Sequence, residues 1–79
     1  MVETRVAPRH RVSKAGTIEF VGGPINCVVR NLSTTGAAIE VPGQAGIPER
    51  FILVMPDDGL RLPCHIVWRT EYRIGVAFD

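Results

Sequence analysis

The chain has 79 residues, of which 46% are hydrophobic and 22% are charged, and its formal net charge at pH 7 is +1. This length suits one domain but not two, and the composition is that of a globular protein and argues against intrinsic disorder. No apolar run approaches the roughly 18 residues of a membrane-spanning helix, and no apolar segment follows the charged N-terminus. We therefore expect a cytoplasmic protein without membrane insertion or a secretory signal.

Positive charge is concentrated at the start of the chain. Residues 1–14 contain Arg5, Arg9, Arg11 and Lys14 against a single acid, whereas acids outnumber bases in the remainder. The first ten residues also offer little apolar surface to bury, so we expect residues 1–10 to form a flexible arm and residues 11–79 to form the folded domain. A cationic arm on a mildly acidic body indicates a local anionic ligand rather than a general affinity for polyanions.

Short segments with apolar residues at alternate positions follow the arm, separated by turn residues. This pattern is typical of β-strands in a small all-β domain. The predicted strands cover residues 16–20, 25–32, 36–41, 50–56, 60–70 and 73–79. No segment has a helical period, and closing six strands into an antiparallel β-barrel would remove the exposed edges of the sheet.

Turn residues mark the connections between these strands. The Gly-Gly-Pro at 22–24 predicts a hairpin-like turn, and the Asp-Asp-Gly at 57–59 predicts a tight hairpin turn that requires positive φ. Pro63 lies inside a predicted strand and indicates an edge position or a bulge, because proline cannot donate to the ladder.

The inward positions of the strands predict the hydrophobic core. Its expected members are Ile18, Phe20, Cys27, Val29, Ile39, Val41, Leu53, Ile66, Trp68, Ile74, Val76 and Phe78. Trp68 shares a face with Cys64 and Ile66, which favours core packing over a role as a base-stacking platform. Both cysteines, Cys27 and Cys64, lie in apolar strand patterns, and we expect them to be buried, reduced thiols.

The sequence lacks the residues that a catalytic or metal-binding site needs. The two histidines are His10, in the arm, and His65, on a strand. Neither is spaced with an acid and a nucleophile as a hydrolase triad requires, and neither joins a cysteine or acidic cluster suited to a metal. We predict no enzymatic activity, no metal and no cofactor.

A second polar motif, "RNLSTTGA" at residues 30–37, runs from the end of one predicted strand to the start of the next. Asn31 and Ser33 can hydrogen-bond to the local backbone there, and Gly36 can adopt the positive φ of a sharp turn. One interpretation is a polar hairpin loop. The other is a ligand cradle, in which short side chains leave backbone N–H groups accessible and the glycine allows close approach.

The two motifs together resemble the signature of the PilZ domain family, which is RxxxR followed by [D/N]xSxxG. Arg5 and Arg9 supply the first half, and Asn31, Ser33 and Gly36 supply the second. The segments "TIEF", "CHIVWR" and "RIGVAFD" fit the family as well, so the resemblance covers nearly the whole chain. It implies a six-stranded β-barrel that binds the bacterial second messenger cyclic di-GMP through these five residues.

The chemistry of the arginines agrees with this implied ligand. Guanidinium offers forked donors for phosphate oxygens or guanine O6 and N7, and it can stack on a base. Ligand binding would order the arm, so that Arg5 and Arg9 act as a clamp and as a switch that passes the signal to a partner protein.

Several alternatives stay open at this point. Thr4 stands where many family members have a further arginine, which leaves ligand affinity and stoichiometry open, and Arg11 and Lys14 either join the site or only flank the first strand. The chain could also be a PilZ-type protein-interaction module with weak or no nucleotide binding. A nucleic-acid-binding barrel is disfavoured, because such barrels expose several aromatics beside basic residues, so we expect neither DNA nor RNA as a partner.

Overall fold

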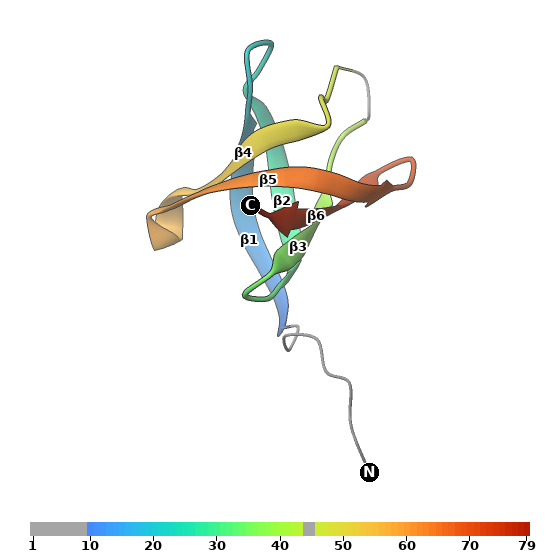
Figure 1. The fold of residues 1–79 in the computed structure, drawn as a ribbon. Coiled ribbons are helices and arrows are strands. Elements are labelled where there is room, and N and C mark those ends of the chain that lie inside the picture. Colours follow the sequence, from blue (N-terminus) through green and yellow to red (C-terminus); the bar gives the residue numbers. More distant parts are fainter. Residues whose placement is uncertain (1–9, 44–45) are drawn as a thin grey trace.

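The computed structural model of the protein describes residues 10–43 and 46–79. Its strands are β1 (His10–Glu19), β2 (Ile25–Leu32), β3 (Gly36–Glu40), β4 (Arg50–Met55), β5 (Leu60–Arg69) and β6 (Arg73–Phe78), with one 3-10 turn, η1 (Pro56–Asp58), between β4 and β5. The strands pair antiparallel and close into a barrel in the order β1-β2-β3-β6-β5-β4 (Figure 1). The predicted all-β class and six-stranded antiparallel barrel are confirmed.

The strand boundaries agree with the sequence pattern except at the start of β1. This strand begins at His10 and pairs along its first half with β2, from Leu32 back to Val28. The alternation of apolar residues begins later in the sequence, so periodicity alone placed the strand start at residue 16. Residues 1–9, with Arg5 and Arg9, lie outside the described residues.

The barrel interior holds most of the predicted core. Ile18, Val29, Ile39, Leu53 and Ile74 have no exposed surface. The cluster also includes Ile47, Phe51 and Met55, which the predicted core did not contain, and Cys64, whose burial was predicted separately. Phe20 and Phe78 are only partly buried against it. The buried set otherwise follows the inward positions of each strand.

Both cysteines are free and buried, as expected. Burial raises the pKa of the Cys27 thiol to about 11. Burial also raises the pKa of the Cys64 thiol, to about 12. Both side chains therefore behave as small core residues.

Two connections deserve comparison with the predicted turns. Residues 56–59 connect Met55 to its antiparallel partner Leu60, so the predicted hairpin turn is present, and η1 (Pro56–Asp58) fills it. Gly59 ends η1 with φ 65° and donates its N–H to the Pro56 carbonyl over 3.1 Å. The predicted positive φ is thus confirmed at Gly59. At the β1–β2 connection the Gly23 N–H donates to the Phe20 carbonyl over 3.1 Å.

Three ladders contain a register shift, and these shifts change which face each strand presents. They fall between Arg11 and Lys14 in β1, between Val29 and Asn31 in β2, and between Ile66 and Trp68 in β5. Each places one extra residue on that strand and so reverses the alternation beyond it. Pro63 does not mark any of them, since it lies inside β5 opposite Ile52.

The shift in β5 overturns the prediction that Trp68 belongs to the core. Ile66 pairs with the buried Val76, but the extra residue Val67 brings Trp68 opposite Gly75, whose strand neighbours both point inward. Trp68 therefore lies on the outer face and is 43% exposed.

Candidate functional site

The β2–β3 loop is held by the hydroxyl of Ser33. Its Oγ accepts hydrogen bonds from the backbone N–H groups of Thr35 and Gly36, each over 3.2 Å. The Ser33 N–H in turn donates to the Gly36 carbonyl over 2.9 Å. This is the local side-chain-to-backbone bonding that favours serine in turns. Ser33 thus fixes the shape of the loop, as one of the two interpretations of the motif predicted.

Gly36 is required for a different reason from the one expected. Its φ is not among the positive glycine values of the described residues, which belong to Gly46 and Gly59. A Cβ at position 36 would instead collide with the backbone carbonyl oxygen of Val76. Gly36 therefore allows β3 to begin close against β6, and the predicted positive φ at this position is wrong.

Beside this loop lies a surface pocket of about 240 Å³. Asn31, Ser33 and Gly36 all line it, so three of the five predicted ligand-binding residues come together. The rest of the lining consists of Leu32, Thr35, Ala37, Ala38, Val67, Trp68, Gly75, Val76 and Ala77. No residue among these described lining positions is charged. The other two predicted residues, Arg5 and Arg9, lie outside the described part of the chain.

Trp68 lines the pocket, whereas the sequence pattern predicted it in the core. A Cβ at Gly75 would collide with its indole ring, so the ring lies directly over that glycine. The missed signal was the unbroken apolar run from Ile66 to Trp68, which leaves strict alternation and faces a glycine in the next strand.

A single row of paired residues connects Asn31 to Trp68 across four strands. Asn31 pairs with Ala38, Ala38 with Gly75, and Gly75 with Trp68. The two central residues, Ala38 and Gly75, are small, and the indole of Trp68 lies over Gly75. Strict alternation from Val29 would have turned Asn31 inward, and the register shift at Arg30 places it on the outer face instead.

Arg30, next to Asn31 in β2, is paired with an acidic residue of β3. The guanidinium of Arg30, the extra residue of β2, lies 3.0 Å from the Glu40 carboxylate, and its Nη1 donates to the Ser13 hydroxyl over 3.3 Å. The hydrogen bond from Arg30, helped by Arg73, holds the pKa of Glu40 below its ordinary value.

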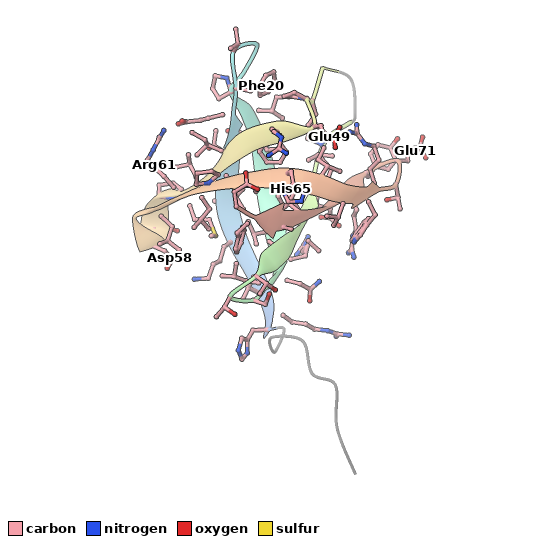
Figure 2. The ribbon with its side chains drawn as sticks, viewed as in Figure 1. Phe20, Glu49, Asp58, Arg61, His65 and Glu71 are labelled. Carbon is pink, nitrogen blue, oxygen red and sulfur yellow. The ribbon has the colours of Figure 1, made fainter. Side chains whose placement is uncertain are left out.

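The two basic residues left open by the sequence have different surroundings. Lys14 pairs with Asp58 over 3.1 Å, at the η1 end of the barrel seen in Figure 2. Arg11 is exposed and pairs in register with Asn31, beside the pocket.

Comparison with known proteins assigns this architecture to a family. A family model described as PilZ domain matches residues 3–79, nearly the full chain. The protein belongs to the PilZ domain family. A comparison with curated proteins gives no match. In the part of the chain that the structure describes, no helix is long and apolar enough to cross a membrane.

The PilZ assignment gives the pocket its context. The NxSxxG half of the family signature lies on the pocket, with Asn31 facing it, Ser33 shaping its loop and Gly36 allowing the close strand approach. The RxxxR half precedes β1, whose first residues pair with the end of β2 beside the same loop (Figure 1).

Proposed function

We propose that this PilZ domain is a receptor module for cyclic di-GMP, which it binds through Arg5, Arg9, Asn31, Ser33 and Gly36. The observation that carries the proposal is the pocket that joins the NxSxxG residues to an exposed indole. Trp68 is added to the predicted site. The module is not an enzyme and acts in the bacterial cytoplasm, where it passes ligand binding to a partner protein.

The size and lining of the pocket suit part of this ligand. Whole drug-sized ligands occupy pockets of roughly 300–1,000 Å³, so a pocket of about 240 Å³ accommodates one guanine and leaves the macrocycle above the surface. Asn31 offers an amide donor and acceptor to the guanine edge, and Trp68 offers a ring face for stacking.

Arg5 and Arg9 then have the macrocycle and the second base to bind. Their guanidinium groups match the phosphodiester oxygens and guanine O6 and N7. Ligand-induced ordering of the segment that carries them would present a new surface to a partner protein.

Calorimetric titration with cyclic di-GMP tests the proposal. We expect the wild-type protein to bind and Arg9→Ala to lose most of its affinity. Arg61→Ala serves as a matched control, because Arg61 pairs with Glu19 over 2.9 Å at the η1 end of the barrel (Figure 2). Absence of binding by the wild type at saturating ligand would favour the PilZ-type interaction module instead. Equal binding by wild type and Arg9→Ala would remove the arginine segment from the site.

A further inference from the structure

The row that connects Asn31 to Trp68 extends one strand further, to Arg11. Arg11 of β1 pairs directly with Asn31 of β2, so one line of residues crosses five strands in the order Arg11, Asn31, Ala38, Gly75, Trp68. A guanidinium and an indole thus mark the two ends of the row, with an amide and two small residues between them.

The register shift in β1 creates this position for Arg11. Lys14 pairs with Val29, so an unshifted strand would place Val12 opposite Asn31. The extra residue brings Arg11 there instead, while Val12 packs against the core. Together with the shifts in β2 and β5, all three irregularities found in the described ladders border this one row. Bulges often re-aim side chains beside binding sites.

The charge of Arg11 is not neutralised by its described neighbours. Lys14 is paired with Asp58, and Arg30 is paired with Glu40. Arg11 makes no ion pair with any residue in 10–43 or 46–79, and its partner in register is the neutral amide of Asn31. An exposed guanidinium beside an uncharged pocket is suited to an anionic group of whatever the pocket binds.

We propose that Arg11 is a further ligand-binding residue that contacts a phosphate of the nucleotide whose base lies between Asn31 and Trp68. Directly paired residues have Cα atoms about 4.5–5.5 Å apart. An arginine side chain is longer than that separation, so the guanidinium of Arg11 is able to extend past Asn31 to the edge of the pocket. A cyclic dinucleotide with one base in the pocket would have its phosphodiester at this edge. This inference rests on the proposed function.

Titrations with cyclic di-GMP at low and at high salt test the role of Arg11. We expect Arg11→Ala to bind about tenfold more weakly, as for loss of one charge-assisted contact. Its affinity should also depend less steeply on salt than that of the wild type, because one fewer cation meets the ligand. Arg11→Lys should keep the salt dependence and recover only part of the affinity, since it keeps the charge but not the fork.

Lys14→Ala is the matched control, because it removes a cation from the same strand whose charge is already paired with Asp58. Its affinity should stay within about twofold of the wild type. The melting temperature of Arg11→Ala should match the wild type, which separates ligand contact from folding, since Arg11 is exposed.

The outcomes separate this inference from the proposed function. A wild type that does not bind overturns the proposed function and this inference with it. A wild type that binds and an Arg9→Ala variant that does not, together with Arg11→Ala of unchanged affinity and salt dependence, overturn the role of Arg11 alone.

Discussion

At the scale of single residues, the candidate site depends on how a few side chains are turned. Trp68 and Asn31 occupy positions that strict alternation would assign to the interior, yet both line the surface pocket. Ser33 and Gly36 act through the backbone, one by binding the loop N–H groups and the other by leaving space for the Val76 carbonyl. Family signature residues thus include both prospective ligand contacts and residues that shape the loop.

Replacing the indole tests whether Trp68 stacks on the ligand. We expect Trp68→Ala to weaken cyclic di-GMP binding roughly tenfold, because base–aromatic stacking contributes about 1–3 kcal/mol. Trp68 is the only tryptophan in the chain, so the intrinsic fluorescence of the wild type should change on titration. Tyr72→Ala is the control, since Tyr72 is also exposed, at 55%, but does not line this pocket. Unchanged affinity in Trp68→Ala would exclude stacking.

At the scale of strands, Arg30 connects the shifted segments of β1 and β2 through its side-chain contacts. It is the extra residue of β2, and its guanidinium contacts Glu40 in β3 and Ser13 within the shifted part of β1. Arg73 of β6 also contacts Glu40, over 3.4 Å. The carboxylate of Glu40 and the guanidinium of Arg30 therefore link β1, β2, β3 and β6, and Glu40 lies two residues along β3 from Ala38 of the row.

Neutralising this carboxylate should loosen the shifted segments. We expect Glu40→Gln to lower Tm by a few degrees at neutral pH and to weaken cyclic di-GMP binding, because Arg30 and hence Asn31 lose their support. The pKa of Glu40 is lowered in the folded state from an ordinary value of 4.5. Its stabilising effect should therefore be complete above that pH and should disappear as the pH falls through the lowered pKa.

Thermal melts of the wild type and of Glu40→Gln between pH 3 and 7 measure the difference in Tm between them, which should shrink with falling pH. Glu19→Gln is the control, because it breaks the 2.9 Å ion pair with Arg61 but leaves the three shifts untouched. Its ligand affinity should equal that of the wild type. A difference in Tm between wild type and Glu40→Gln that grows below pH 4.5 would contradict the assigned role of the carboxylate.

The strands could be predicted from the sequence, but the shifts could not. Alternation of residues such as Ile25, Cys27 and Val29 identifies a strand and its inner face without knowledge of its neighbours. An extra residue such as Arg30 or Val67 is defined only by the register against a partner strand, which one sequence does not reveal. The NxSxxG residues were therefore found through their motif, whereas Trp68 was assigned to the wrong face.

At the scale of the whole molecule, one closed interior contains both thiols. Cys27 and Cys64 are 6% and 1% exposed and lie in the same core cluster. In a closed barrel a reagent reaches them only when strands separate, so their reactivity reports on the opening of the barrel.

Both thiols should resist modification in the native state. With burial raising their pKa values to about 11 and about 12, only about one thiol in a thousand or fewer is ionised at pH 8. We expect native protein to react with a thiol reagent at pH 8 far more slowly than protein in denaturant, in which both thiols should react rapidly. Rapid reaction of either cysteine in the native protein would contradict its burial.

The order of strands around the barrel has a consequence for synthesis on the ribosome. The turn with Asn31, Ser33 and Gly36 is translated early, but the strands that complete its pocket, β5 and β6, come last. β6 must insert between β3 and β5, and long-range pairings of this kind form only after both partners are available. A nascent chain therefore has no complete pocket until residue 77 has emerged, and a ligand of this pocket can assist folding only after that point.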